Sequence, residues 1–314
     1  MEVRVVAPLT IVVNPAAGGG KAIRHLPVVR AVLDAGGAHY LTRQSSSLRH
    51  ARTLAAEAAA RGDVVVAFGG DGMAGAVASA VAQARPEGDG VFGVIPAGRG
   101  NDLVRTHGIP FGPADAAQLL LAGQSRPMDL IAITGADGTR TTVAGSVYLG
   151  IATVAGQIAN ETRLIRGQLV YPVAALRALA GWKPATFIVD PMGSASTAGT
   201  ITARQEFRGY GVVVANIPYF GAGMKVAPGA DPSDGLLDIV LMRHAPKLAF
   251  LRVLAKIKNG AHVELDQVGT GRAATVAVTF DRPLRVGADG ESFPIPAPLR
   301  ITVLPGALSV IVPR

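Results

Sequence analysis

Residues Asp63–Phe68 read DVVVAF, and Gly69-Gly70-Asp71-Gly72 follows them without a break. The apolar run has the length of a buried strand, and the residues from Gly72 to Ala84 have the pattern of a helix. Strands that are apolar on both faces are typical of parallel sheets covered by helices. This stretch therefore predicts an α/β domain with a glycine-rich turn at the carboxyl end of one strand.

The same order of strand, small-residue turn and helix occurs before and after this stretch. One copy runs from Leu9–Val13 through Asn14-Pro-Ala-Ala-Gly-Gly-Gly to a helix over Lys21–Leu33, and another from Val91–Ile95 into Pro96-Ala-Gly-Arg-Gly-Asn-Asp102. Between them we expect a strand at His39–Thr42 and a serine-capped helix over Ser45–Ala60. The alternation predicts a mostly parallel sheet with both faces covered.

The pattern changes near residue 134 to short strands rich in Val, Thr and Ile, separated by Gly, Pro and Asp turns. Two helices interrupt them, at Val170–Leu179 and Pro246–Lys258. We therefore expect an antiparallel β-rich domain over residues 134–297, after an α/β domain over residues 1–133. The predicted strands are Thr141–Ala144, Thr186–Val189, Gly199–Ala203, Tyr210–Ala215, Leu237–Met242, Ala274–Phe280 and Leu299–Leu304.

Composition excludes several classes of function. The 314 residues contain no Cys, which removes disulfides, thiolate metal sites and a Cys nucleophile. The six His are dispersed and no Ser lies in a G-x-S-x-G turn, so neither zinc nor hydrolase chemistry is indicated. Apolar runs are strand-sized, which predicts a cytoplasmic protein. Its charge of +8 suits anionic partners, but the cations are scattered, so we expect no nucleic acid.

The three glycine-rich turns predict a nucleotide site, because such turns bring backbone amides and helix N-termini close to phosphates. Gly18-Gly-Gly-Lys21 lacks the spacing of a P-loop. Gly70-Asp-Gly-Met-Ala-Gly75 has the spacing of a dinucleotide turn, but Asp71 would face the pyrophosphate. A carboxylate among such glycines is better explained by Mg²⁺, which binds one or two carboxylates together with phosphate oxygens.

The sequence resembles the diacylglycerol kinase catalytic-domain family. It is most similar to the soluble bacterial lipid kinases of that family, which are related to sphingosine kinases and, more distantly, to NAD kinases. The resemblance covers nearly the whole chain and depends on the order and spacing of several motifs. These are Asn14-Pro15, Gly69-Gly-Asp-Gly72, Pro96-Ala-Gly-Arg-Gly-Asn-Asp102 with Arg105, Met128-Asp129-Leu130, Asn216, Gly221-Ala-Gly223, Ala227-Pro-Gly-Ala-Asp231-Pro-Ser-Asp-Gly-Leu-Leu-Asp238 and Asp289-Gly-Glu291.

The resemblance implies a fold, an activity and a set of site residues. The last strands, residues 298–314, should return to the first domain, which would bind ATP, and the second domain would bind a lipid alcohol. Asp289 matches the proposed general base, with Glu291 beside it. The implied ATP contacts are Asn14, Pro15, Gly18, Lys21, Thr42, Gly69, Gly70, Asp71, Gly72, Gly75, Gly98, Arg99 and Asn101. The implied Mg²⁺ ligands are Asp71, Asp102 and Asp129 in the active site, and Asp231, Asp234 and the carbonyl of Leu236 in a structural site.

The chain also departs from the family pattern and leaves alternatives open. After Gly72 it reads Met73-Ala74-Gly75-Ala76, where the family usually has Thr, an apolar residue, Asn and Glu. An NAD kinase and a catalytically weak nucleotide- or lipid-binding regulator are the alternative functions. Asp289-Gly290 is also the usual signal of a two-residue hairpin turn. Asp71 could be a helix cap, and Asp231 and Asp234 an ordinary turn.

The preferred interpretation is an ATP- and Mg²⁺-dependent lipid kinase that acts on diacylglycerol. Its excess positive charge, and a substrate held in a bilayer, predict peripheral membrane contact at the inner face of the membrane. The sequence also allows a homodimer.

Overall fold

The computed structural model describes residues 7–162, 170–196 and 199–314. The chain forms two compact units. Unit 1 comprises Met1–Asp129 with Pro305–Arg314, and unit 2 comprises Leu130–Leu304. From the sequence we expected the chain to pass from the first domain to the second between residues 133 and 134, and to return between residues 297 and 298. Both changes of unit fall inside long strands, which is why no loop or linker in the sequence marks them.

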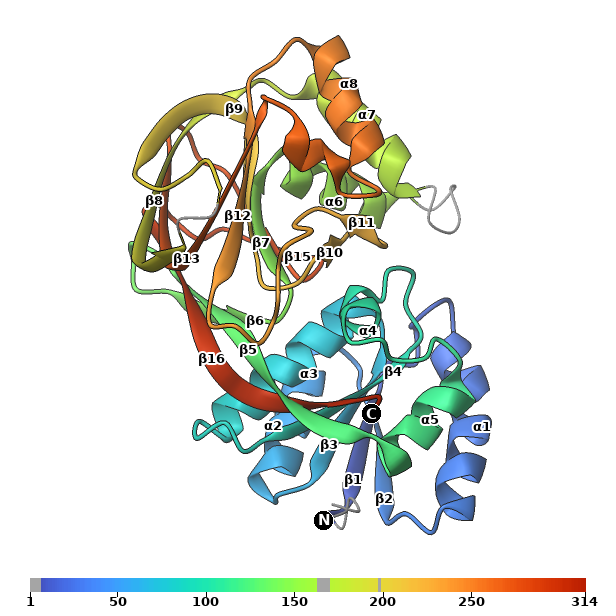
Figure 1. The fold of residues 1–314 in the computed structure, drawn as a ribbon. Helices are drawn as coiled ribbons and strands as arrows, with labels where there is room; N and C mark the ends of the chain where they lie inside the picture. Colours follow the sequence, from blue (N-terminus) through green and yellow to red (C-terminus); the bar gives the residue numbers. More distant parts are fainter. Residues whose placement is uncertain (1–6, 163–169, 197–198) are drawn as a thin grey trace. The chain divides into compact units, whose positions relative to one another are not determined.

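Unit 1 contains a parallel sheet in the order β2-β1-β3-β4-β16 (Figure 1). The prediction of a parallel sheet is confirmed. β1 and β3 are buried along their whole length, as their continuous apolar runs require. The last strand joins the edge at β4, where Ser309 lies opposite Val91. The strands are β1 (Leu9–Val13), β2 (Tyr40–Gln44), β3 (Val64–Gly69), β4 (Val91–Pro96) and the second half of β16 (Leu299–Val312).

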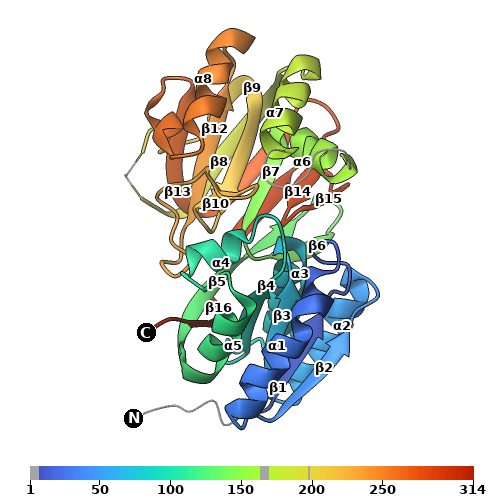
Figure 2. The ribbon, with the colours of Figure 1, turned by 90° about the vertical axis from the view of Figure 1, so that its right-hand side faces the viewer.

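Helices cover both faces of this sheet (Figure 2). α2 begins later than predicted, because Ser47 is its cap and accepts a hydrogen bond from His50 N at 3.1 Å. Ser45 is buried instead and its hydroxyl donates to the Val13 carbonyl. The helices are α1 (Lys21–Ala35), α2 (Leu48–Ala60), α3 (Asp71–Ala84), α4 (Asp102–Thr106) and α5 (Pro113–Ala122).

Unit 2 is built on antiparallel strands, as predicted. β12 pairs with β9 on one side and β13 on the other, and β8 pairs with both β9 and β13. Their inward side chains form an aliphatic core that includes Val212, Ile239 and Val276. The strands are the end of β5 (Gln124–Thr134), β6 (Arg140–Val143), β7 (Ser146–Gly150), β8 (Ala185–Ser196), β9 (Gln205–Ala215), β10 (Tyr219–Phe220), β11 (Met224–Lys225), β12 (Leu237–Arg243), β13 (Val268–Phe280), β14 (Val286–Ala288), β15 (Glu291–Phe293) and the first half of β16.

Two expectations for unit 2 were wrong. Gly199–Ala203 is not a strand, because the N–H groups of Thr200 and Ile201 both donate to the Thr270 carbonyl, which bends the segment. A helix also forms at Ile151–Glu161, where none was predicted. The helices of unit 2 are α6 (Ile151–Glu161), α7 (Val170–Gly181), α8 (Lys247–Lys256) and the 3-10 helix η2 (Ala261–Glu264). In the described residues, no helix is both long and apolar enough to span a bilayer.

Candidate active site

The three glycine-rich turns of unit 1 lie together at the carboxyl ends of β1, β3 and β4. Asn14 N donates to the Phe68 carbonyl at 3.0 Å, and Ala97 N donates to the Gly69 carbonyl at 2.7 Å. These bonds join each turn to its neighbour directly after the strands end. The crevice beyond these strand ends is where open α/β sheets bind ligands. The sequence-based grouping of the three turns is therefore present in the structure.

Glycine is required where two of the turns meet. A Cβ atom at Gly98 would lie 2.5 Å from the Cα atom of Gly70, which is closer than real Cβ contacts come. A Cβ atom at Gly18 would overlap the Ala97 carbonyl oxygen, and Gly18 also has a φ of +59°. The backbones of the 14–20, 69–72 and 97–101 turns can approach only because these residues lack side chains.

Asp71 links the second turn to the third. Its carboxylate accepts hydrogen bonds from the backbone N–H groups of Asn101, at 2.7 Å, and Asp102. The Asn101 side chain in turn bonds both backbone groups of Gly98, and Asn101 has a φ of +55°. Burial raises the pKa of the Asp71 carboxyl, and the hydrogen bonds from Asp102 and Asn101 oppose part of that rise. Asp71 is thus more than a helix cap, because it fixes the neighbouring turn.

Thr42 carries a buried polar atom with no partner in the described part of the chain. Its Oγ1 is inaccessible to solvent and makes no hydrogen bond. Thr42 lies in β2 opposite Ile11 of β1, two residues before that strand ends. Buried hydroxyl groups are normally satisfied, so an unpaired one beside a predicted nucleotide site agrees with an external partner.

The remaining predicted nucleotide residues of unit 1 lie at or near the same turns. Asn14 holds its own turn through a bond from Ala16 N to Oδ1 at 3.0 Å. Lys21 and Arg99 are exposed cations, Lys21 at the start of α1 and Arg99 in the third turn. Gly75 lies inside α3 and is buried, one turn away from Asp71. Pro15 and Gly72 are partly exposed in the first turn and at the start of α3.

The departure from the family pattern at Met73–Ala76 is a packing feature. All four residues are buried in α3. A Cβ atom at Gly69 would lie 2.7 Å from the Met73 side chain, so Met73 fills the space beside Gly69. The hydroxyl, amide and carboxylate usual at these positions are replaced here by apolar contacts.

Asp102 and Asp129 are both buried in unit 1, with 7% and 2% of their surface exposed. Asp129 accepts a hydrogen bond from Gly306 N at 2.8 Å, which ties the middle of β5 to β16. Across residues 7–162, 170–196 and 199–314, no three acidic or His side chains are grouped as ligands of one metal ion would be. The predicted Mg²⁺ site with Asp71 therefore stays a prediction.

In unit 2, Asp289 holds a turn in place. Asp289-Gly290 joins β14 to β15 with φ values of +46° and +82°, the two-residue hairpin turn that the sequence indicated. The two carboxylate oxygens accept from Ala144 N at 2.6 Å and Gly145 N at 2.8 Å. Asn216 bonds the same two residues from another strand end, through Nδ2 to the Ala144 carbonyl and through N to the Gly145 carbonyl. The carboxylate is therefore fixed in orientation.

Glu291 follows this turn as the first residue of β15 and is partly exposed. Its neighbour Ser292 accepts a hydrogen bond from Gln157 Nε2 at 3.2 Å, which connects the hairpin to α6. The hairpin is thus supported both at the 144–145 turn and at a helix.

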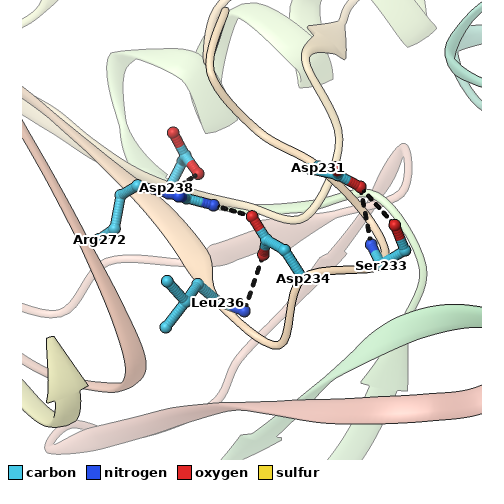
Figure 3. Close-up of polar contacts among 6 residues, drawn as sticks. All are labelled: Asp231, Ser233, Asp234, Leu236, Asp238 and Arg272. Atoms are coloured by element: carbon cyan, nitrogen blue, oxygen red, sulfur yellow. Dashed lines mark hydrogen bonds and ion pairs between the residues drawn. The ribbon is translucent and has the colours of Figure 1, made fainter. Parts of the chain in front are cut away.

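Among the predicted structural Mg²⁺ residues, Asp234 is paired with an arginine (Figure 3). Asp234 bonds Leu236 N at 3.0 Å through Oδ1, and its Oδ2 pairs with Arg272. Arg272 also pairs with Asp238, at 3.0 Å. Asp231 accepts from the N–H and hydroxyl of Ser233, as an ordinary Asx turn does. One cation of the chain already compensates part of this acidic cluster.

Comparison with known proteins assigns the family. The diacylglycerol kinase catalytic domain model matches residues 8–148, and the YegS C-terminal NAD kinase beta sandwich-like domain model matches residues 145–312. A diacylglycerol kinase from Mycobacterium tuberculosis is 33% identical over 311 residues, covering 98% of this chain and 96% of the relative. The chain belongs to the diacylglycerol kinase family.

A second relative and a solved structure are also similar to this chain. A diacylglycerol kinase from Bacillus subtilis is 27% identical over 90% of this chain and 88% of its own length. The crystal structure of a diacylglycerol kinase from Bacillus anthracis covers 97% of this chain and 96% of that structure, with a TM-score of 0.72 and 21% identity, and shows the same fold. The family assignment makes this protein a lipid kinase.

The sequence did not reveal the contacts that Arg272 and Asn216 make in this lipid kinase. Arg272 lies in β13 opposite Asp238 of β12, so its role appears only once the strand register is known. Asn216 was visible in the family motifs, directly after a buried strand, but its contact with the 144–145 turn depends on the pairing of β7 with β9.

Proposed function

We propose that this lipid kinase transfers a phosphoryl group from ATP, with Mg²⁺, to the hydroxyl of diacylglycerol. The observation that carries the proposal is the position of Asp71, which lies partly buried between two glycine-rich turns and is held there by the backbone N–H groups of Asn101 and Asp102. Membership of a kinase family supports the use of a nucleotide.

The residues of unit 1 fit a magnesium–nucleotide complex. Gly70 and Gly98 let two of the turns approach each other closely, and Thr42 Oγ1 is buried without a partner in the described residues. No Lys or Arg in the described residues forms an ion pair with Asp71, so its charge is available to a cation. ATP bound there would supply the phosphoryl group, with Mg²⁺ to neutralise phosphate charge. Lys21 and Arg99 would add positive charge at the rim of the same turns.

We propose Asp289 as the general base toward the acceptor hydroxyl, with Glu291 beside it. The two Asp289 oxygens accept hydrogen bonds from Ala144 N and Gly145 N, and an ionised carboxylate is a suitable acceptor for the proton of a substrate hydroxyl. Two fixed hydrogen bonds orient the carboxylate before substrate binds, which favours proton transfer. Gly145 and Asn216 support this orientation and do not themselves need to touch substrate.

Asp231, Asp234 and the Leu236 carbonyl remain our proposed site for a structural Mg²⁺. Oxygen ligands in a short loop suit this ion. Because Arg272 pairs with Asp234, the ion would bind beside an arginine already in place, and its contribution would be to the stability of the loop before β12.

The test is phosphorylation of lipid by the purified protein with labelled ATP and Mg²⁺. Diacylglycerol in detergent micelles, a total lipid extract and NAD are offered in parallel. We expect label in phosphatidic acid, little in other lipids and none in NADP. Label in NADP alone would support the NAD kinase alternative. ATP–Mg²⁺ binding without any labelled lipid would identify the regulator that the apolar Met73–Ala76 segment suggests.

A further inference from the structure

Helices α7 and α8 carry half of the large apolar side chains that are exposed in the described residues. These are Leu176 of α7, 50% exposed, and Leu248 and Leu251 of α8, 79% and 37% exposed. The two helices pack at the same end of unit 2, and Lys247 Nζ donates to the Ala180 carbonyl at 2.6 Å (Figures 1 and 2). Single exposed leucines are ordinary, but three on two adjoining helices form a feature.

The orientation of α8 follows from its own sequence. Phe250 and Val253 are fully buried and Ile257 nearly so, and they anchor one side of the helix in the core of unit 2. Leu248 lies one turn before Leu251 and Arg252, and this spacing places all three residues on the opposite side of the helix. Leu248 and Leu251 are therefore directed to water and do not pack in the core of unit 2.

Helices α7 and α8 themselves carry basic side chains and no acid, and the first acid after α8 in the sequence is Glu264 of η2. Residues 239–263 contain five Lys or Arg and no Asp or Glu. Residues 170–189 contain Arg177 and Lys183 and also no acid. The exposed cations Arg177, Arg252 and Lys256 therefore lie beside the leucines without acidic neighbours on their own helices. We define Leu176, Arg177, Leu248, Leu251, Arg252 and Lys256 as the α7–α8 face.

We propose that the α7–α8 face docks on an anionic lipid surface. Leucines flanked by Lys and Arg match an interface with acyl chains below and anionic headgroups above. A second copy of this face is disfavoured, because like charges would meet across the contact. Nucleic acid would use the cations and leave the leucines in water. The proposal goes beyond the kinase reaction, since it concerns a surface formed without any of the glycine-rich turns.

The test measures binding of the full chain to phosphatidylcholine vesicles with and without phosphatidylglycerol. Leu248→Gln/Leu251→Gln should weaken binding about tenfold or more at every salt concentration. Arg252→Gln/Lys256→Gln should weaken it about 10- to 30-fold at low salt, and less as salt rises. Matched controls are Val28→Gln/Leu41→Gln and Arg30→Gln/Arg49→Gln, which change exposed residues of unit 1 in the same way. The controls should bind like the wild type.

Three results would overturn the proposal. One is equal binding of all variants, and another is a change of oligomeric state caused by the α8 variants alone. The third is that the Arg252→Gln/Lys256→Gln variant loses binding to duplex DNA while its binding to vesicles stays equal to that of the wild type. Phosphorylation of diacylglycerol in detergent micelles, which needs no bilayer, separates this proposal from the proposed reaction. If the wild type phosphorylates diacylglycerol in micelles but does not bind vesicles, only the docking proposal is contradicted. If it binds vesicles but phosphorylates no diacylglycerol in micelles, only the proposed reaction is contradicted.

Discussion

Asp71 of unit 1 and Asp234 of unit 2 are both carboxylates predicted to meet Mg²⁺, and their surroundings differ. Asp71 is partly buried and is held by two backbone N–H groups from the next turn. Asp234 is partly exposed, and the guanidinium of Arg272 pairs with it. A backbone amide orients a carboxylate and leaves its charge uncompensated, whereas an arginine compensates the charge directly.

The difference teaches where an external cation has most to contribute. Burial raises the pKa of Asp71, so its ionised form is destabilised until a cation approaches. Beside Asp234, burial also raises the pKa of Asp238, but Arg272 opposes that rise. A cation bound at Asp71 would therefore supply charge balance that unit 1 does not give this carboxylate, whereas the unit 2 cluster is balanced in part by its own arginine.

The largest effect should follow a change of Asp71. Asp71→Asn removes the charge and places an amide NH₂ against the N–H of Asn101 or Asp102, so we expect lipid phosphorylation to fall by about 100-fold or more. Magnesium-dependent nucleotide affinity, measured by calorimetry, should fall as well. Asp89→Asn is the control, since Asp89 is an exposed acid of unit 1 paired with Arg85. Turnover near the wild-type rate would show that Asp71 only shapes the turns.

Asp289 should behave differently, because it belongs to the proposed acceptor side. Asp289→Asn should reduce turnover by about 10²–10⁴-fold while nucleotide affinity stays close to the wild-type value. The amide also loses one acceptor for Ala144 N or Gly145 N, so part of the effect is structural.

Asn216→Ala separates the two roles of Asp289. It removes the bond to the Ala144 carbonyl and loosens the same turn while the carboxylate remains. If both variants lose activity equally, with equal thermal shifts, Asp289 is a structural clamp and not a base.

A smaller effect, on stability, is expected at the acidic cluster of unit 2. Arg272→Gln leaves Asp234 and Asp238 without their cation and should lower the free energy of unfolding by about 1–3 kcal/mol. The effect should not be larger, because all three side chains are partly exposed. Mg²⁺ should then raise the melting temperature more than it does in the wild type. Arg300→Gln, an exposed arginine of β16, is the control. A melting curve unaffected by chelator in both proteins would contradict the structural Mg²⁺ site.

The smallest effect concerns His262, which is fully buried, with Nε2 3.0 Å from the Val226 carbonyl. Burial lowers its pKa below the ordinary value of 6.5. The unfolded chain therefore binds a proton at this residue more readily than the folded chain does. The contribution of neutral, buried His262 to the free energy of unfolding is complete above pH 6.5 and is lost as the pH falls through the lowered pKa. His262→Gln should flatten the dependence of the melting temperature on pH in this range. His25→Gln, at an exposed position of α1, should leave it unchanged.

The sequence predicted the elements whose local pattern is strong, and missed those decided by distant contacts. Val64–Gly69 and Val91–Pro96 form as continuous apolar strands, and the turns after them meet because parallel strands end at one edge. The Asp289-Gly290 hairpin follows from its two residues alone. By contrast, the bend at Gly199–Ala203 depends on the Thr270 carbonyl, about 70 residues away.

The candidate site shows the same division. Asp71 and its glycines were found from local sequence, because a carboxylate within a glycine-rich turn is unusual. The contact from Asp71 to Asn101 N joins residues 30 apart, and that from Asp289 to Ala144 N joins residues 145 apart. Motif order placed these residues in one family pattern, but only the fold shows which backbone groups they hold.

The course of β16 has a consequence for the order of events during synthesis. Its first residues belong to unit 2, and Ser309 and Val310 complete the sheet of unit 1 beside β4. The strand that covers the β4 edge is thus translated more than two hundred residues after β4 itself. Until then, the backbone of β4 on that side has no strand partner, and an open strand edge is a site of misassembly. The nascent unit 1 must stay protected at this edge while the ribosome makes the whole of unit 2.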